Sequence, residues 1–496
     1  MTAALVIAGG FQVLAQDKSE EVKTELLSLD ELAGSAALWT MTNEQFAKKY
    51  VAEKKKEKDK EKKEAKEAGV VVVTPEKEKE KKEAEEAKAA ARPENKYRVF
   101  EWLSAAKNAA RYQGTSSSFS IIGKEVKRKK RQAMIGDVEV GETIVRFADG
   151  KVKTVEFSIF NRGDNGKLRK PAFEKKLKSA ATFVNSRSGA RGEKPTGRTA
   201  SAARADRMIW RGKEAYYQLE YSFQRSAGIQ GFVAEFIKLK VVPASAGSIM
   251  ARVAKSKLAD RRSLRDRVVK RPTGDVLIDS VPMVDQGAKG YCAVASAERV
   301  LRYYGLEVDQ HEMAQIAGSS AFGGTSSEKM TEALERTAGR LKVRIRKLYE
   351  AFEEYDEFER LLKKYNRAAK KNPEATVFPI VKGRWWPYQA LYHDGDPTAM
   401  KTALADGPKY DRFKKDIAEN VDVGVPLLWS LYLGVFPEKG IPQAAGGHMR
   451  VITGYNRKND ELIYSDSWGA GHEEKRMKFD EAFTMTMGLR ILIPSR

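Results

Sequence analysis

The sequence predicts an α+β protein whose C-terminal half places helices first and an antiparallel sheet after them. Three observations lead to this prediction: a helical pattern follows Cys292, apolar strand patterns crowd the last third of the chain, and a Lys/Glu/Ala-rich tract precedes both. The expected order is a possible signal peptide, short helices, a charged linker, a smaller α+β domain, a basic connector helix and the C-terminal domain. Their limits are 1–15, 16–47, 48–92, 93–245, 246–274 and 275–496, respectively.

The first 92 residues show few apolar patterns. Residues 1–15 are apolar and end in a small-residue cleavage pattern, but no Lys or Arg precedes the apolar run. We expect export to the periplasm, cell surface or medium, and a cytoplasmic location if this segment is not a signal. Ser28 and Thr42 each begin a capping-box pattern, which predicts short helices. The tract at 48–92 mixes both signs of charge without an apolar stripe, which predicts a solvated helix or a disordered linker.

The accessory domain at 93–245 is predicted from strand and helix patterns. Strands are expected at 152–159, 217–221 and 232–242, and helices at 100–114 and 173–183. Basic residues mark an exposed loop at 185–204 and the connector helix at 249–269. Because the domain offers no nucleophile and base pair, we expect it to influence substrate range or location more than the chemical step.

The composition limits the classes of function. The chain has 90 Lys and Arg against 68 Asp and Glu, a formal net charge of +22, which predicts weak association with a polyanion or the cell envelope. No aromatic-interleaved basic motif accompanies this charge, so specific nucleic-acid binding is not expected. No apolar run in the sequence reaches the roughly 18 residues of a membrane span. No phosphate-binding loop, dinucleotide motif or multi-cysteine metal site occurs, so neither a cofactor nor a metal is expected.

Cys292 is the only cysteine in the chain, and it stands where a helix is predicted to begin. Apolar residues repeat at three-to-four spacing over 293–304, and Gly305 ends the pattern. Unpaired amides and the macrodipole at a helix N-terminus favour negative charge, which lowers a thiol pKa from about 8.5 into the range of about 3.5–7.5. Gln286, on the preceding loop, can aim its amide NH2 at a developing oxyanion. The alternative is a buried cysteine that serves only as a small apolar side chain.

Two strand patterns near the C-terminus supply a base and a carboxylate. Residues 446–455 and 462–469 are expected to pair as a hairpin centred on Arg457. In that register His448 faces Asp466 directly, at the roughly 4.5–5.5 Å Cβ separation of opposed residues. The cysteine then has a base and an orienting group, as a thiol nucleophile requires. The alternative is a coincidental buried ion pair beside an inert thiol.

The other three histidines are weaker candidates for chemistry. His311 is expected on the surface of a helix and His393 in a turn. His472 follows Trp468 closely and could approach the site, but no orienting partner for it is visible in the sequence.

These residues resemble the catalytic residues of papain-like cysteine peptidases. Gln286 matches the oxyanion glutamine, Gly290 matches the glycine before the nucleophile, and Asp466-Ser-Trp-Gly469 is similar to the Asn-Ser-Trp-Gly signature. The interval from Cys292 to His448 is close to the papain interval of about 130–150 residues.

Two departures narrow the resemblance. Asp466 stands in place of Asn, and Ala293 stands in place of an aromatic residue. Both features are more similar to the bacteriocin-processing (double-glycine leader) peptidases, a branch that uses Cys, His and Asp. The resemblance covers about residues 275–496 and implies a papain-like fold, a peptide or protein substrate and a thioester acyl-enzyme. The oxyanion hole would consist of Gln286 and the backbone N–H of Cys292.

Three other functions stay open at this point. A transglutaminase or a cell-wall amidase also uses a Cys–His pair, although the Gln286 spacing and the Asp-Ser-Trp-Gly segment argue against both. A polyanion-binding surface protein with a degenerate catalytic domain would explain the net charge. A leader peptidase attached to a transporter would need transmembrane segments and an ATP-binding motif, and the sequence shows neither.

Overall fold

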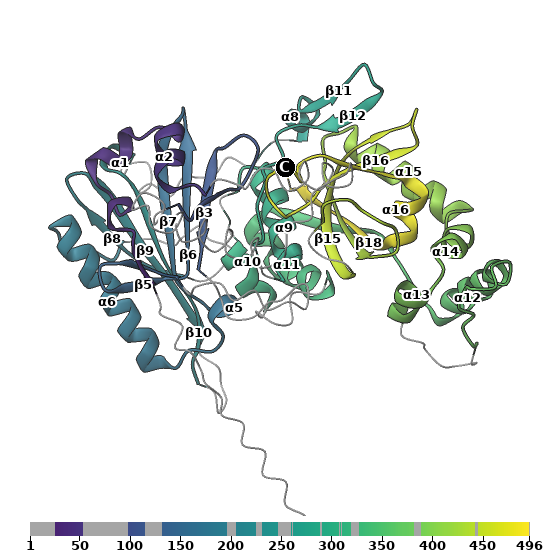
Figure 1. Cartoon of the computed structure of the whole chain (residues 1–496), viewed down its shortest axis with the longest axis horizontal. Coiled ribbons are helices and arrows are strands. Elements are labelled where there is room, and N and C mark those ends of the chain that lie inside the picture. Colours follow the sequence, from purple (N-terminus) through teal and green to yellow (C-terminus); the bar gives the residue numbers. More distant parts are fainter. Residues whose placement is uncertain are drawn as a thin grey trace, which may run out of the picture.

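The computed structural model describes most of the chain, and its buried apolar residues form two main hydrophobic cores. The described residues are 25–52, 98–114, 131–195, 205–224, 231–246, 259, 261–287, 290–306, 308, 310–318, 327–380, 388–441 and 445–495. One core draws on residues 27–241 and defines the N-terminal unit, while the other draws on residues 264–492 and defines the C-terminal unit. Figure 1 shows the two units side by side, purple to blue for the first and teal to yellow for the second. The signal segment expected at 1–15 and most of the linker expected at 48–92 lie outside the described residues, and the predicted domain limits stay a prediction.

The N-terminal unit is built on a seven-stranded antiparallel sheet of order β2-β3-β6-β7-β10-β9-β8, beside a three-stranded sheet of order β1-β4-β5. α6 (Lys170–Ser188) packs on the large sheet and buries Phe173, Ala180 and Val184. The strand limits are Glu25–Ser28 for β1, Glu101–Trp102 for β2, Ala109–Gln113 for β3, Arg131–Ile135 for β4, Val138–Val140 for β5, Glu142–Ala148 for β6, Lys151–Asn161 for β7, Asp206–Arg211 for β8, Ala215–Gln224 for β9 and Val233–Pro243 for β10. The short helices are Ala36–Thr40 (α1), Asn43–Tyr50 (α2) and Arg162–Asn165 (α5).

Alternation of apolar residues correctly predicted β7, β9 and β10, and the helical pattern at 173–183 corresponds to α6. The helix expected at 100–114 is wrong, because this segment forms β2 and β3. β3 lies between β2 and β6, and four of its five residues are buried. A strand covered on both faces loses the alternation that identifies a strand in sequence. The loop expected at 185–204 begins later than predicted, because α6 continues to Ser188.

The two capping-box patterns, at Ser28 and Thr42, had different outcomes. Thr42 caps α2 as predicted, with Oγ1 accepting from the Gln45 N–H at 3.2 Å and Gln45 Oε1 accepting from the Thr42 N–H at 2.9 Å. Ser28 instead ends β1, and only a single 3-10 turn, Asp30–Leu32, follows it. The segment 25–52 shares the core of the N-terminal unit through buried residues such as Phe46.

The C-terminal unit consists of an antiparallel sheet with helices packed around it. The strand order is β11-β12-β15-β14-β18-β13, and β16 pairs with β15 and β17. The strand limits are Val268–Lys270 for β11, Asp275–Ile278 for β12, Val343–Glu350 for β13, Leu427–Leu433 for β14, Gly446–Asn456 for β15, Glu461–Ser465 for β16, Lys475–Lys478 for β17 and Thr486–Pro494 for β18. The helices are Arg261–Arg265 (α8), Cys292–Tyr303 (α9), Gln310–Ala317 (α10), Ser327–Leu341 (α11), Tyr355–Ala369 (α12), Tyr388–Asp394 (α13), Pro397–Leu404 (α14), Pro408–Val421 (α15) and Phe479–Met485 (α16). α9, α10 and α11 lie between the two large sheets (Figure 1). No helix within the described ranges is long and apolar enough to cross a bilayer.

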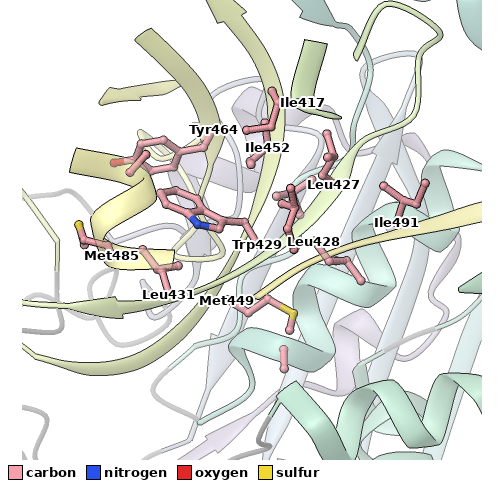
Figure 2. Close-up of a cluster of buried hydrophobic side chains, with 14 of the residues drawn as sticks. Ile417, Leu427, Leu428, Trp429, Leu431, Met449, Ile452, Tyr464, Met485 and Ile491 are labelled. Carbon is pink, nitrogen blue, oxygen red and sulfur yellow. The ribbon is translucent and has the colours of Figure 1, made fainter. Parts of the chain in front are cut away.

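The centre of this sheet is apolar on both faces. β14 lies between β15 and β18, and nearly all of its residues are buried, as its continuous apolar sequence predicted. Figure 2 shows Trp429 beside Tyr464 in this core, with Met449 on the side of the neighbouring helix. The Trp429 indole Nε1 donates to Thr486 Oγ1 at 2.8 Å, so the polar end of this large ring is satisfied. A tightly packed sheet of this kind holds the side chains at the ends of its strands in fixed positions.

The connector expected as one helix at 249–269 is wrong in its described part. Only the short α8 is helical, and Val268 already begins β11. Val268 and Val269 pair with Ile278 and Leu277 of β12. β-Branched residues such as Val268 and Val269 favour a β-strand over a helix. The helical spacing of the basic residues in this segment therefore did not produce a helix.

Candidate active site

Cys292 is the first residue of α9 and directly follows Tyr291 at the N-cap. The helix packs on β15, where Ser296 Oγ donates to the Met449 carbonyl at 3.1 Å. The C-terminal end is as predicted, since Gly305 takes φ +87° just after the last turn. The Cys292 thiol is half-buried. The local sequence thus places the only cysteine at a helix start that is anchored to the central sheet.

The electrostatic setting of Cys292 favours the thiolate. Burial by itself raises the pKa of the thiol, but the positive charge of the neighbouring His448 ring outweighs it. Backbone contacts with Met449 and Ala293 act in the same direction. The pKa of Cys292 is therefore lowered from its ordinary value, as expected for a thiol beside a cation at a helix N-terminus.

His448 lies near the start of β15, and its side chain has no exposed area. Its Nε2 atom lies 2.6 Å from Asp466 Oδ1. Burial lowers the pKa of His448, but the Asp466 carboxylate and then the Cys292 thiolate reverse this and raise it to about 9. Because Nε2 is engaged by Asp466, Nδ1 is the ring nitrogen left to exchange a proton with the thiol. The arrangement favours an imidazolium and thiolate pair at neutral pH.

Asp466 follows β16 and is fully buried. Besides His448, its Oδ1 atom accepts from the Ser467 N–H at 2.8 Å, and its Oδ2 atom accepts from Arg450 Nε at 2.6 Å. Burial opposes the charge of this carboxylate, but the two neighbouring cations, His448 and Arg450, hold its pKa well below the usual range. Arg450 also pairs with Glu438 at 2.9 Å. Asp466 therefore stays ionised inside the protein.

The hairpin register differs from the one expected. β15 and β16 pair Val451 with Ser465, and a bulge lies between Ile452 and Gly454. Continued by one pair, this register sets Asp466 beside Arg450 and not directly opposite His448, so the predicted direct opposition is wrong by two residues. A two-residue shift keeps every side chain on its original face. Asp466 can therefore reach both His448 and Arg450, which lie on one face of β15.

An aromatic side chain covers the imidazole. The Trp468 ring stacks on the His448 ring with centroids 4.4 Å apart and planes 13° apart. His472 meets the edge of Trp468 at 5.9 Å, and its backbone carbonyl accepts from the Asp466 N–H at 2.8 Å. The His472 ring itself does not join the hydrogen-bonded set around Asp466; its carbonyl only supports the turn. Trp468 limits water access to the His448–Asp466 bond.

Gln286 is buried and tied to the segment that carries Asp466. Its N–H donates to the Ser467 carbonyl at 2.8 Å, and its side-chain Oε1 accepts from Ser467 Oγ at 2.6 Å. Because the amide oxygen faces Ser467, the amide NH2 points to the other side of the same planar group. Residues 288 and 289, between Gln286 and Gly290, lie outside the described part of the chain.

The sequence did not identify two buried arginines that hold these segments together. Arg450 binds Asp466, as described above. Arg299, on α9, donates to the Pro282 carbonyl at 2.8 Å, to the Asp466 carbonyl at 3.0 Å and to Ser465 Oγ at 2.5 Å. Burial lowers the pKa of Arg299 to about 10, so it remains charged at neutral pH. The sequence signal that could have identified Arg299 was a charged residue among the apolar positions on the buried face of an amphipathic helix.

The remaining histidines lie elsewhere. The surface position expected for His311 is wrong, since it is 7% exposed and its Nε2 atom lies 3.0 Å from Glu142 Oε2 of the N-terminal unit. Its Nδ1 atom contacts Asn161 of the same unit. His393 is exposed at the end of α13. In the parts of the chain that the structure describes, no cluster of His, Cys, Asp and Glu is arranged to hold a metal ion.

Comparisons with known proteins agree with this reading of the C-terminal unit. Residues 383–488 match the model of the Peptidase_C39 like family, a span that includes His448 and Asp466 but begins after Cys292. No curated protein matches the chain. Among solved structures, the chain is similar to xylellain, a cysteine protease from Xylella fastidiosa, with 14% identity, a TM-score of 0.21, and coverage of 47% of this chain and 90% of that one. A TM-score this low supports no further conclusion, so the match of residues 383–488 carries the comparison.

Proposed function

Because residues 383–488 match the Peptidase_C39 like family, we propose that the protein hydrolyses peptide bonds with the four side chains singled out in its sequence. They are Cys292, His448, Asp466 and Gln286. The observation that carries the proposal is the buried 2.6 Å contact between His448 and Asp466 beside the thiol at the start of α9. A buried carboxylate–imidazole pair next to a cysteine is the arrangement that activates a thiol nucleophile.

Acylation begins with the Cys292 thiolate, which attacks the carbonyl carbon of the scissile peptide bond. The carbonyl oxygen becomes an oxyanion, and the Gln286 amide NH2 and the Cys292 backbone N–H donate to it. The protonated His448 ring then gives its proton to the leaving amine as the C–N bond breaks. The products of this step are a free amine, a neutral imidazole and a thioester on Cys292.

Deacylation reverses the proton transfers. The neutral imidazole of His448 takes a proton from water, which attacks the thioester and releases the carboxylic acid and the thiolate. Asp466 accepts a hydrogen bond from the ring throughout, fixes its orientation and stabilises its positive charge. The pKa shifts of Cys292 and His448, in opposite directions, support this division of roles.

Labelling of the single cysteine tests the proposal directly. The full-length protein is treated with iodoacetamide over a range of pH, and adduct formation is followed by intact mass. We expect one adduct, a reactivity pKa below the ordinary thiol value of about 8.5, and none in Cys292→Ala. Turnover of quenched-fluorescent casein should disappear in the same variant. A reactivity pKa near 8.5, or full turnover by Cys292→Ala, would refute the proposal.

Product analysis separates the related reactions. A peptidase gives new peptide termini from casein, whereas a transglutaminase incorporates an added primary amine and an amidase releases fragments from peptidoglycan. We expect new termini only.

Export and weak binding to polyanions are further proposals, which rest on residues 1–15 and on the net charge of +22. N-terminal sequencing of the secreted form and salt-dependent retention on an anionic resin test them.

A further inference from the structure

An arginine of the N-terminal unit reaches into the loop that carries Gln286. Arg111 lies on β3 and is 6% exposed. Its Nη1 atom donates to the Asp285 carbonyl at 2.9 Å, and its Nη2 atom lies 3.0 Å from Asp285 Oδ2. Asp285 is the residue directly before Gln286, and its Oδ1 atom accepts from the Gly287 N–H at 2.7 Å. One guanidinium therefore fixes both the main chain and the side chain next to the oxyanion glutamine.

The strand that carries Arg111 leaves no space beside this loop. Gly287 has φ +69°, and a Cβ atom there would lie 2.5 Å from Gln113 Oε1 and 3.1 Å from Arg111 Nη1. The loop can therefore lie against β3 only with glycine at this position. In Figure 1, β3 stands on the side of the N-terminal sheet that faces α9.

A second contact from the same unit reaches the residue before the nucleophile. Tyr291 is fully buried, and a Cβ atom on Gly163 would lie 1.2 Å from its hydroxyl oxygen. The N-terminal unit thus contacts this segment at two places, once at Asp285 just before Gln286 and once at Tyr291 just before Cys292.

The charge of Arg111 is maintained although it is buried. Burial opposes its positive charge, but Asp285 and Glu142 outweigh it, so the pKa of Arg111 is raised. Glu142 in turn contacts His311 of α10 at 3.0 Å. Guanidinium contacts to a carboxylate and a carbonyl at once are strong and directional, which suits a group that sets the geometry of a loop.

From these contacts we propose that Arg111 is a positioning residue of the peptidase, through which the N-terminal unit holds the Gln286 loop in its oxyanion-binding shape. The inference rests on the proposed function. It assigns the N-terminal unit a part in the chemical step, where the sequence predicted an influence on substrate range or location. Arg111 itself touches no reacting atom; it acts through Asp285 and Gln286.

The test compares full-length variants on a quenched-fluorescent peptide chosen from the casein cleavage products. In Arg111→Met we expect kcat to fall by about 10–100-fold, part of the roughly 10²–10³-fold that one oxyanion donor contributes. KM should change less than about threefold, and the pH profile of Cys292 alkylation should stay the same, because Arg111 contacts neither Cys292 nor His448. Arg111→Lys keeps the charge but not the double contact and should lose less.

The matched control is Arg187→Met. Arg187 lies on α6 of the same unit and also donates to main-chain carbonyls, those of Ala33 at 3.2 Å and Asp30 at 3.4 Å, away from the C-terminal unit. Its turnover should equal that of the unmodified protein. If Arg111→Met does not fold, Asp285→Asn weakens the same contact from the other side and should lower kcat in the same way.

A double variant decides whether Arg111 acts through Gln286. Because the two residues form one unit in the proposal, Arg111→Met combined with Gln286→Ala should lose no more activity than Gln286→Ala alone. Independent, multiplied losses would overturn the inference, and so would normal kcat in Arg111→Met or Asp285→Asn while Gln286→Ala is impaired. Full turnover by Cys292→Ala would instead remove the proposed function itself.

Discussion

Replacement of Asp466 by Asn asks whether the site needs a negative charge or only a hydrogen-bond acceptor. On the resemblance alone, Asn should retain substantial activity, because papain-like relatives use it at this position. The structure predicts the opposite. His448 Nε2 lies 2.6 Å from one carboxylate oxygen and Arg450 Nε lies 2.6 Å from the other. An Asn side chain has one acceptor oxygen, so its NH2 group must face one of these two donors.

The expected loss follows from the charges around Asp466. Against the effect of burial, the carboxylate is the main cause that raises the pKa of His448 from 6.5 to about 9. A shift of this size is worth about 3.4 kcal/mol in favour of the imidazolium, or roughly 300-fold. Loss of one partner from a buried ion pair also costs about 3–5 kcal/mol of folding free energy. We therefore expect Asp466→Asn to lose at least about 100-fold in kcat/KM at pH 7 and to melt at a lower temperature.

The assay is kcat/KM measured from pH 5 to 10, which reports the pKa values of the free enzyme. Activity of the unmodified protein should fall on the alkaline side near pH 9, as His448 loses its proton. In Asp466→Asn this limb should move to lower pH, because the charge that raised the pKa is gone. Asp480→Asn, which affects an ion pair with Lys401 outside the site, is the control. Removal of the competing donor in Asp466→Asn with Arg450→Met should recover about 10-fold.

Retention of activity within about threefold in Asp466→Asn, with the alkaline limb still near pH 9, would refute this reasoning. The hydrogen-bond acceptor alone would then suffice, and the Arg450 contact would not restrict the amide. Thermal melts at the same pH values separate loss of folding from loss of chemistry.

Three further predictions concern neighbouring contacts. Gln286→Ala should lower kcat about 10–1000-fold by loss of one oxyanion donor while iodoacetamide labelling of the thiol stays normal, and a parallel loss of labelling would make Gln286 structural. Trp468→Ala should admit water to the His448 ring and lower kcat roughly 10-fold, whereas Trp468→Phe keeps a stacked ring and should lose less. Arg476 holds the pKa of Asp275 well below the usual range, so Asp275→Asn should lower the free energy of unfolding by about 2–3 kcal/mol. In urea titrations from pH 3 to 7 this difference should be full above about pH 4 and shrink below it, because the carboxyl takes up a proton in the unfolded chain while the native carboxyl stays ionised.

Local patterns in the sequence predicted much of the C-terminal unit. The apolar stripe and Gly305 gave α9 its correct limits, and the unbroken apolar run before His448 gave the central strand β14. These features depend on neighbours in sequence, so no knowledge of the tertiary structure was needed. The catalytic roles of the residues at this site stay predictions, although the geometry brings His448 and Asp466 together.

What the sequence could not supply were contacts between distant segments. The hairpin turn is centred between Lys458 and Asn459 and not on Arg457, and a bulge after Ile452 changes the register by one residue; a short polar turn in the sequence indicates neither. Arg111 was assigned to a helix, because a strand buried on both faces shows no alternation. His311 has ordinary helical surroundings in sequence, and only the N-terminal sheet explains its burial. Each of these depends on which surfaces meet, and one sequence does not encode that in a local pattern.

The place of β18 in the sheet has a consequence for the timing of synthesis. This strand, residues 486–494, lies between β14 and β13, so the sheet has a gap until it arrives. The ribosome adds about 5–20 residues per second, so roughly 2–9 s separate His448 from the end of β18. During that interval β14 has only one of its two neighbours, and the strand that carries His448 rests on an incomplete sheet. A nascent peptidase of this design would stay inactive until the segment that completes its sheet has left the exit tunnel.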